Sequence, residues 1–273
     1  RYNTVLNTDT NQLEVENLNE INREFSRLNE HILSANINYQ HDFAFGDFTP
    51  TLKMGGYTEY RTREYNTRLF IYSWKNGLPS NYRVMNVPDE LMQDKNYGED
   101  KLYLLEQVDW RNNYEGNNML GAGYAGVNLP FGKWNIYAGV RFEHSRMELI
   151  SNTQKNEKSP TSVYYTYDDF FPSLNAAYRL NEQHQFRLSY GRTVNRPEFR
   201  EVSSSVYYDF DLASNVQGNY DLKAAYIDNI DLGYEYYPSN GELISVSLFY
   251  KKFKNPIEWT YTVAGGTDLV YSY

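Results

Sequence analysis

The feature that most constrains the fold of this chain is a strict alternation of apolar and polar residues. In Trp134–Phe142 every second residue is apolar, and the residues between them are polar or small, ending with Arg141. Successive side chains of a β-strand point to opposite faces, so this alternation predicts strands with one polar face. The apolar set lacks charged residues throughout the alternating segments, which are residues 33–40, 52–61, 134–143, 170–180, 185–190, 229–236 and 244–251. Both a membrane β-barrel and a soluble β-sandwich tolerate this alternation, so the connections between the strands must distinguish these two folds.

Short and long connections between these strands alternate along the chain. The short turns carry Gly, Pro, Asn or Asp and lie at Asp42–Phe48, Pro130–Lys133, Asn181–His184 and Pro238–Glu242. The long polar stretches cover about residues 64–116, 150–163 and 193–225. Tight turns at one rim and long external loops at the other are typical of an antiparallel transmembrane β-barrel, whereas such loops are unusual in a compact soluble domain. We therefore predict an all-β, antiparallel transmembrane barrel, in part or whole.

Composition agrees with a membrane barrel and excludes several other classes. The 273 residues include 28 Tyr and 14 Phe, yet charged residues reach 22%, as expected for strands that face lipid on one side and water on the other. No apolar run approaches the ~20 residues of a transmembrane helix. Without cysteine there are no disulfides or thiolate sites, and a net charge of −9 argues against a nucleic-acid partner.

One segment departs from the two-residue period. Its apolar residues recur at intervals of three and four, which predicts a short helix in an external loop; they are Leu18, Ile21, Phe25, Leu28 and Ile32. The alternative is a strand that extends back through Phe25. Aromatic residues also gather beside the short turns, as in the interfacial girdle of a membrane protein or in aromatic cross-strand pairs; they are Phe43, Phe45, Phe48, Phe131, Trp134, Tyr236 and Tyr237.

Sequence motifs for chemistry are weak. Gly121–Gly126 has the spacing of a dinucleotide fingerprint, but a turn follows too soon for the required helix, so a glycine-rich strand is the preferred interpretation. The histidines, which lie at positions 31, 41, 144 and 184, have no metal-ligand spacing. External-loop carboxylates offer calcium ligands, although solvated side chains are the simpler interpretation; they are Asp168, Asp169, Asp209 and Asp211. Ser203–Ser205 lacks the context of a catalytic nucleophile, and we predict no enzyme activity and no cofactor.

The stretch from Phe170 to Asn255 resembles the C-terminal part of the barrel in TonB-dependent outer-membrane receptors, especially those of Bacteroidota. The similar pieces occur in the family's order: Phe171–Asn175, Phe186–Thr193, Arg196–Glu201, Gly218–Lys223, Asn229–Glu235 and Val246–Lys252, with Gly139–Glu143 upstream. The family's loop usually reads Gly-Asn-Pro-x-Leu-Lys-Pro-Glu, and here Tyr220 and Ala224-Ala225 replace the prolines and the acid. We interpret the residues of these loops as markers of the family's architecture in preference to direct ligand contacts. They are Arg196, Pro197, Glu198, Phe199, Gly218, Asn219 and Leu222.

The resemblance implies a receptor that takes up a scarce nutrient, such as a siderophore, an oligosaccharide, a peptide or cobalamin. We expect the chain to be a single barrel fragment, with about ten strands of the family's roughly twenty-two. We also expect both ends to be cuts, so that the plug domain and the energy-coupling box lie elsewhere in a longer protein. The implied partners are outer-membrane lipid, a TonB-type periplasmic coupling protein, the nutrient ligand and a surface lipoprotein.

Ligand contacts are predicted on loop aromatics that can stack on sugars, peptides or metal chelates: Tyr72, Trp74, Tyr82, Trp110, Tyr207 and Tyr208. The alternative is that these rings pack the loops together. Two other functions stay open at this stage. One is a complete ten-stranded barrel that serves as an adhesin or surface hydrolase, whose first and last strands would be hydrogen-bonded. The other is a soluble carbohydrate-binding sandwich.

Overall fold

The computed structural model describes residues 4–9, 11–15, 22–75, 93–209, 211–212, 214–264 and 268–273. The chain divides into two compact parts. The smaller part comprises Arg1–Asn29, Tyr65–Asn113 and Asn152–Ser159, and the larger comprises Glu30–Glu64, Tyr114–Ser151 and Pro160–Tyr273. No helix among the described residues has both the length and the apolar character needed to cross a bilayer.

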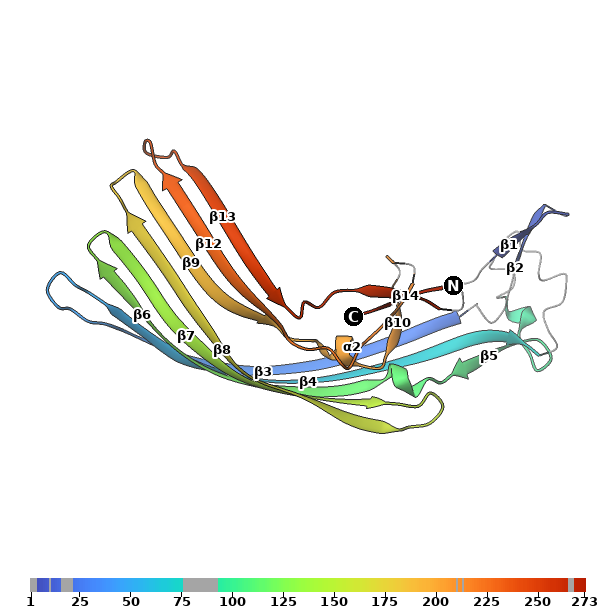
Figure 1. The fold of residues 1–273 in the computed structure, drawn as a ribbon. Coiled ribbons are helices and arrows are strands. Elements are labelled where there is room, and N and C mark those ends of the chain that lie inside the picture. The colour runs from blue at the N-terminus through green and yellow to red at the C-terminus, as the bar shows by residue number, and fades with distance from the viewer. Residues whose placement is uncertain are drawn as a thin grey trace. The chain divides into compact units, whose positions relative to one another are not determined.

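A nine-stranded sheet forms most of the structure (Figure 1). Its order is β13-β12-β9-β8-β7-β6-β4-β3, and β5 pairs with β4 beside this path. The strands are β3 (Asn22–Asp42), β4 (Thr51–Trp74), β5 (Leu102–Gln107), β6 (Tyr114–Phe131), β7 (Trp134–Asn152), β8 (Pro160–Arg179), β9 (His184–Asn195), β12 (Ala225–Tyr236) and β13 (Ile244–Lys254). Consecutive long strands are neighbours, as short hairpin turns require, and the predicted all-β antiparallel fold is confirmed.

The predicted short turns lie where expected, between β3 and β4, β6 and β7, β8 and β9, and β12 and β13. Backbone hydrogen bonds also join neighbouring turns to one another. The N–H of Arg179 donates to the carbonyl of Lys133 at 2.8 Å, and the N–H of Tyr237 donates to the carbonyl of Gln183 at 2.8 Å. The turns at this rim are therefore hydrogen-bonded sideways as well as along their own hairpins.

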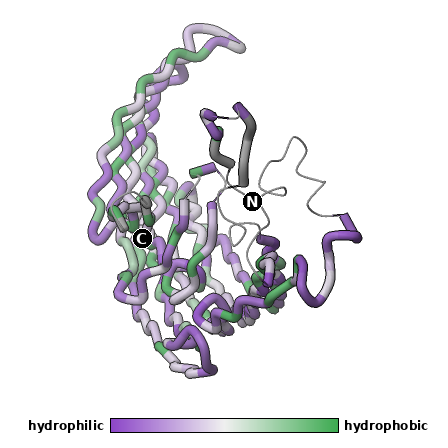
Figure 2. Tube along the Cα trace, turned by 90° about the vertical axis from the view of Figure 1, so that its right-hand side faces the viewer, coloured by the Kyte–Doolittle hydropathy of each residue, from purple (hydrophilic) through white to green (hydrophobic). Residues whose placement is uncertain are grey.

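The two faces of the sheet differ in chemistry. Across β6 and β7, Ala125 is opposite Val140 on one face, and Tyr124 is opposite Arg141 on the other. We call the face with the charge-free set the outer face and the face with Arg141 the inner face. Figure 2 shows hydrophobic and hydrophilic residues alternating along the strands. On the outer face Leu248 is 66% exposed, because no other part of the described chain covers it.

The apolar part of the outer face has a clear limit along β7. Every second residue is apolar from Trp134 to Phe142, and the next outer-face residues are His144, Arg146 and Glu148. Nine residues at a rise of about 3.4 Å and a tilt of ~40° span about 23 Å, which matches the apolar band of a transmembrane barrel. The strand continues to Asn152, so β7 is longer than a bilayer requires.

The predicted helix near Phe25 is wrong. β3 begins at Asn22 and continues without interruption to Asp42, while Leu18 and Ile21 lie outside the described residues. The ring of Phe25 packs edge-on against Phe70 of β4, with centroids 5.8 Å apart. β3 pairs with β4, and a helix here would have no apolar surface against which to bury its apolar side, since Ile32 is 52% exposed.

The predicted external loops are also shorter than expected, because strands extend into them. The stretch of residues 64–116 contains the end of β4, all of β5 and the start of β6, together with the 3-10 helices η3 (Asp94–Asn96) and η4 (Trp110–Asn112). The smaller part also holds a hairpin of β1 (Thr4–Asn7) and β2 (Gln12–Val15). Charged pairs such as Arg68 with Glu106, at 2.8 Å, stabilise the β4–β5 pairing by polar contacts. Hydrophobic period alone did not reveal these extensions.

A second, four-stranded sheet lies in the larger part, with the order β10-β11-β15-β14. Its strands are β10 (Val206–Asp209), β11 (Ser214–Gln217), β14 (Thr260–Ala264) and β15 (Asp268–Ser272), and β11 and β15 run parallel. The short helix α2 (Phe199–Val202) precedes this sheet in sequence. Phe199, Val202 and Val216 are each at most 1% exposed, so several of the best-buried described residues lie around α2 and β11.

The alternative of a complete small barrel required hydrogen bonds between its first and last strands. In the sheet order β3 and β13 are at opposite edges, and no pairing joins them within the described residues. That expectation is not met.

Candidate functional site

The segment that follows β9 packs on the inner face of the sheet and forms a polar site in the larger part. We call Arg196–Ser205 the inner loop. Pro197 has no N–H to donate, so the strand ladder ends there. Glu198 and Glu201 form a capping box at the start of α2, in which the carboxylate of Glu201 accepts from the N–H of Glu198 at 2.8 Å.

Phe199 anchors the inner loop to the sheet. Its side chain is 1% exposed and lies directly over Gly116 of β6, where an added Cβ would collide with the ring. The guanidinium of Arg63 lies 5.4 Å from the centroid of the same ring. A glycine at position 116 is thus required by the close approach of an aromatic ring, not by backbone conformation.

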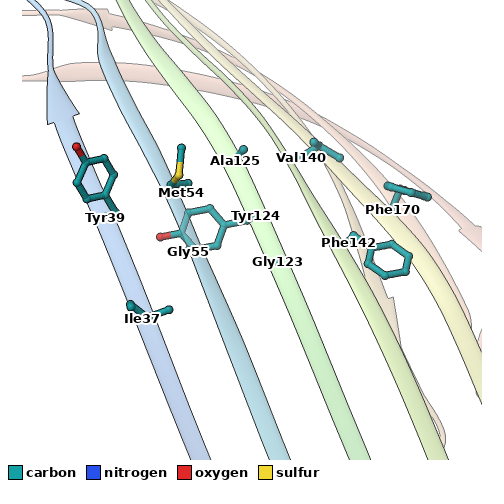
Figure 3. Close-up of a pocket in the computed structure, with 10 residues that line it drawn as sticks. All are labelled: Ile37, Tyr39, Met54, Gly55, Gly123, Tyr124, Ala125, Val140, Phe142 and Phe170. Carbon is teal, nitrogen blue, oxygen red and sulfur yellow. The ribbon is translucent and has the colours of Figure 1, made fainter.

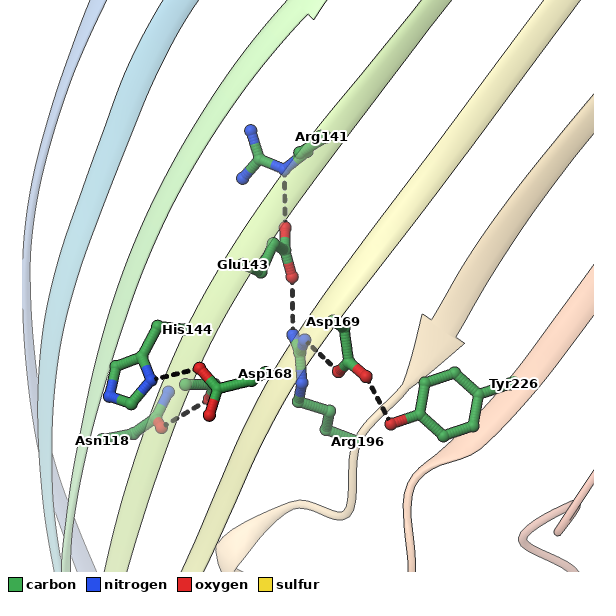
Figure 4. Close-up of polar contacts among 9 residues, drawn as sticks. Asn118, Arg141, Glu143, His144, Asp168, Asp169, Arg196 and Tyr226 are labelled. Carbon is green, nitrogen blue, oxygen red and sulfur yellow. Dashed lines mark hydrogen bonds and ion pairs between the residues drawn. The ribbon is translucent and has the colours of Figure 1, made fainter.

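Arg196 forms the centre of a charged network on the inner face (Figure 4). Its guanidinium donates to Glu143 at 2.7 Å and to Asp169 at 3.0 Å. Glu143 also accepts from Arg141 at 2.6 Å, and Asp169 accepts from the hydroxyl of Tyr226 at 2.7 Å. The side chains of Arg196, Glu143 and Asp169 are only 12–18% exposed, so these charge-assisted bonds are partly shielded from water. Together they hold the inner loop to β7, β8 and β12.

Glu198 connects the inner loop to β4 by ion pairs that are longer than those of Arg196. Its carboxylate lies 3.5 Å from Arg61 and 3.9 Å from Arg63, both on β4. Beneath it is a cavity of about 310 Å³, lined by residues of the inner loop and of the inner face; among them are Glu59, Arg61, Asn118, Ser145, Tyr167 and Arg196. The cavity therefore presents both charge signs and a phenol, which suits a polar ligand more than an apolar one.

The loop marked by Gly218, Asn219 and Leu222 packs on the inner loop. An added Cβ on Gly218 would collide with the carbonyls of Arg200 and Ser203 at the end of α2. The N–H of Asn219 donates to the carbonyl of Glu201 at 2.6 Å, and its side chain donates to the carbonyl of Tyr273 at 3.0 Å. The N–H of Leu222 donates back to the carbonyl of Asn219 at 3.3 Å, which closes the turn. The seven marker residues thus lie in one packed region.

Glycines on β4, β6 and β7 have a similar relation to aromatic rings. The ring of Tyr124 lies over Gly55, and the ring of Tyr137 lies over Gly126 and Gly139. β6 is continuous from Tyr114 to Phe131, so the dinucleotide spacing is not followed by a helix, and the interpretation as a glycine-rich strand is confirmed. An aromatic side chain that covers a glycine on a neighbouring strand replaces the missing side-chain contacts.

The predicted ligand aromatics fall into two separate groups. In the smaller part, Tyr72 and Trp74 are at the end of β4, and the Tyr72 ring lies 6.3 Å from that of Tyr97. Burial and the neighbouring Tyr72 raise the pKa of Tyr97. Trp110 opens η4, with the Lys158 amine 4.7 Å from its ring centroid. Tyr82 lies outside the described residues.

The other two predicted aromatics, Tyr207 and Tyr208, lie on β10 in the larger part. The guanidinium of Arg200 lies 3.2 Å from the ring centroid of Tyr207, and the hydroxyls of Tyr207 and Tyr273 are 3.4 Å apart. Burial and the hydrogen bond with Tyr273 raise the pKa of Tyr207 well above its usual range. Ligand contact by any of these aromatics stays a prediction.

Of the predicted calcium ligands, Asp168 and Asp169 lie within β8 and not in an external loop. Asp168 faces His144 at 2.8 Å, and Asp169 is bonded to Arg196. Asp209 accepts the N–H groups of Asp211 and Leu212 at 2.9 and 3.0 Å, as in a capped turn. No cluster of three or more metal-ligand side chains occurs in the part of the chain that the structure describes.

The sequence interpretation missed the partners of Arg196. Glu143 and Asp169 are far apart in sequence from Arg196, and only the pairing of β7, β8 and β9 brings them together. The sequence contains a signal for them, because both acids lie in the polar phase of their strands, near the middle of β7 and of β8.

Comparison with known proteins agrees with this architecture. Two solved structures share the fold: the ferric citrate transporter FecA in its unliganded form, with a TM-score of 0.56 and 14% identity, and the ferric-catecholate import receptor Fiu from E. coli K12 in its closed form, with a TM-score of 0.52 and 17% identity. These alignments cover 89% and 90% of this chain but only 30% and 33% of those proteins, so the chain spans about a third of their length. Among curated proteins no sequence matches significantly.

The family model for the β-barrel of TonB-dependent receptor-like proteins matches residues 1–273. The proteins of this family are located in the outer membrane, so the outer face described above is the lipid-facing side of a barrel wall. The chain belongs to the TonB-dependent receptor family, as a segment of its outer-membrane β-barrel.

Proposed function

We propose that this barrel segment forms part of the wall of a receptor that takes up a scarce nutrient across the outer membrane. The observation that supports this most is the difference between the two faces of the sheet. The outer face is free of charge across the membrane band, whereas the inner face carries the Arg196 network and the cavity of about 310 Å³. A wall that is apolar outside and polar inside suits passage of a polar solute through the lumen.

The proposal does not include catalysis. Ser203, the first serine of the Ser203–Ser205 run, is fully buried, and its hydroxyl is bonded to that of Ser205 and to the carbonyl of Arg200. A buried hydroxyl with two neutral partners is satisfied structurally and has no base to activate it. Energy for uptake would come from a TonB-type periplasmic protein that displaces the plug domain of the receptor.

The ligand class is proposed at two levels. The general level is a nutrient that is too large or too rare for diffusion through porins, such as a metal chelate, an oligosaccharide or a peptide. The finer level is a ferric chelate, which is what the two solved structures of the same fold are named for. Aromatic residues such as Tyr72 at the end of β4 and Trp110 of η4 suit the flat catecholate or sugar faces of such ligands.

Uptake by the full-length receptor tests the proposal. A strain without the receptor gene should fail to accumulate the transported compound, and the intact gene should restore accumulation. Substitution of Trp110 by Ala should raise the ligand Kd of the purified receptor, whereas K252Q on β13 should not. Equal accumulation of ferric chelates, oligosaccharides and peptides with and without the gene would contradict the transport function. Restoration of oligosaccharide uptake alone would contradict only the ferric-chelate level.

A further inference from the structure

The outer face contains a groove that neither the proposed transport function nor the inner loop explains. Its volume is about 620 Å³, within the range of small-ligand sites. We call it the outer groove. It is lined by Ile37, Tyr39, Met54, Gly123, Ala125, Val140, Phe142 and Phe170 of the outer face. Gly55 and Tyr124, whose strand positions belong to the inner face, complete the lining.

The groove arises from the distribution of side-chain size across neighbouring strands (Figure 3). Ile37 and Met54 project on one side, and Val140 and Phe142 project on the other. Between them Gly123 of β6 has no side chain, and an added Cβ there would come no closer than 3.9 Å to another residue, the backbone of Gly55. The missing side chain therefore leaves open space between two apolar ridges.

The walls of the groove are apolar and uncovered. Ile37 is 72% exposed, Phe170 is 64% exposed and Val140 is 45% exposed, and none of the lining residues is charged. The rings of Phe142 and Phe170 contact each other, with centroids 5.0 Å apart, which makes that wall continuous across β7 and β8. In the outer membrane this surface faces hydrocarbon, so its natural occupant is part of a lipid.

Polar residues limit the groove at one end. His144 and Asp168 are the next outer-face residues beyond Phe142 and Phe170, and their side chains are paired at 2.8 Å. This pair lies where the apolar band stops, on the side of the band away from the short turns. An amphiphile whose chain fills the groove would have its polar headgroup at this end, which is the side of the external loops and hence of the outer leaflet.

We propose that the outer groove is a binding site for one acyl chain of an outer-leaflet lipid. A chain in the groove contacts apolar atoms on three sides, whereas a chain on an ordinary convex stretch of the wall contacts them on one. Dispersion contacts are individually small but add up over many atoms. An acyl chain therefore has a longer residence time in the groove than on the rest of the lipid-facing wall. The two flanking ridges and the glycine floor define its position on β3, β4, β6, β7 and β8.

Fluorescence quenching by acyl-brominated lipids tests this proposal in the full-length receptor reconstituted in vesicles. The variant F142W reports on the groove, and L248W reports on ordinary lipid contact, because Leu248 is 66% exposed on the same face of β13. The parent protein supplies the signal of the natural tryptophans. We expect quenching of F142W to saturate at a several-fold lower mole fraction of brominated lipid than quenching of L248W.

A groove-filling variant supplies the second comparison. G123L places a side chain in the groove, where the structure leaves room for it, and should make the F142W curve follow that of L248W. G121L is the matched control, because Gly121 lies on the same face of the same strand, has open space above it and does not line the groove. Identical curves for F142W and L248W, or equal effects of G123L and G121L, would overturn the proposal. Dimerisation that G123L abolishes would overturn it as well, by assigning the groove to a second copy of the chain.

Discussion

At the scale of single residues, Arg196 is the position at which the inner loop depends most on charge. It pairs with Glu143 and Asp169, all three side chains being at most 18% exposed, so its removal leaves Asp169 without a cation and Glu143 with Arg141 alone. Some other arginines on the sheet have ion pairs that water screens. Arg187, whose partner is Glu235 at 3.1 Å, is 55% exposed.

We therefore expect R196M to lower the free energy of unfolding by about 2–3 kcal/mol, because it removes the cation partner of the partly buried Asp169 and one of the two cation partners of Glu143. R187M should change it by less than about 1 kcal/mol, since exposed ion pairs contribute little. Urea unfolding of the receptor in lipid vesicles measures both. Equal effects of the two substitutions would show that the Arg196 network does not hold the inner loop.

In the smaller part, the ionisation of Asp109 makes the local stability depend on pH. Burial opposes the charged form of its carboxylate, but the hydrogen bonds from the Arg111 side chain and N–H prevail and lower its pKa below 3.8. A group whose pKa is lowered in the folded state stabilises that state above the unfolded value, and the stabilisation is lost as pH falls through the lowered pKa. The turn that carries Trp110 should therefore loosen below about pH 3.8.

Acrylamide quenching of Trp110 checks this expectation. Accessibility of the ring should rise as pH falls below 3.8 in the parent receptor. In D109N the ring should be accessible at neutral pH and show no such transition, because the amide cannot form the ion pair. A transition of the same size in D109N would assign the pH dependence to another group.

At the scale of structural elements, each long strand separates two environments. The alternation that the sequence showed is preserved in the register of β6 with β7, where Val140 belongs to the outer face and Arg141 to the inner. Spin labels at Val140 and Leu248 should accordingly be reached by lipid-borne quenchers. Shielding of both labels would contradict the membrane assignment of the outer face.

Substitution by a charged residue measures the difference between the outer and inner faces as a change in the free energy of unfolding. V140R should destabilise the receptor by about 2–4 kcal/mol, as expected for a cation in the lipid-facing band. N175R, on the inner face of β8 opposite Ser189, should have a much smaller effect. Thermal unfolding in detergent followed by refolding into vesicles compares the two, and equal losses would mean that the two faces do not differ in environment.

The packing of α2 against β6 requires the absence of a side chain at Gly116. G116V would place two methyl groups where the Phe199 ring lies and should displace α2, at a cost of about 1–3 kcal/mol for overpacking. G121V, on the same strand in open space, is the control. Limited proteolysis should cleave near Phe199 in G116V only, and a cleavage pattern equal to that of G121V would contradict the predicted anchoring.

The sequence predicted the strands of the membrane band and their short turns, because one-sided burial imposes a period of two and tight turns need particular residues. It did not predict the strand around Phe25 or the extension of β4 to Trp74. Beyond the membrane band neither face has to be apolar, so the period of two disappears while backbone pairing continues. The inner loop was marked by family resemblance, but its contacts with Glu143 and Asp169 depend on strands distant in sequence.

At the scale of the whole molecule, the chain contributes a nine-stranded wall and spans about a third of the length of solved proteins with the same fold. The surface of this wall is divided by function. The outer face meets lipid and contains the outer groove, and the inner face holds the inner loop and its cavity. Substitutions on one face should thus alter lipid contact without altering ligand contact, and the converse.

The sideways hydrogen bonds between neighbouring turns have a mechanical consequence. Arg179 to Lys133 and Tyr237 to Gln183 tie three hairpins into one continuous band of backbone. Such a band does not stretch unless several bonds break together, so this rim of the wall resists widening.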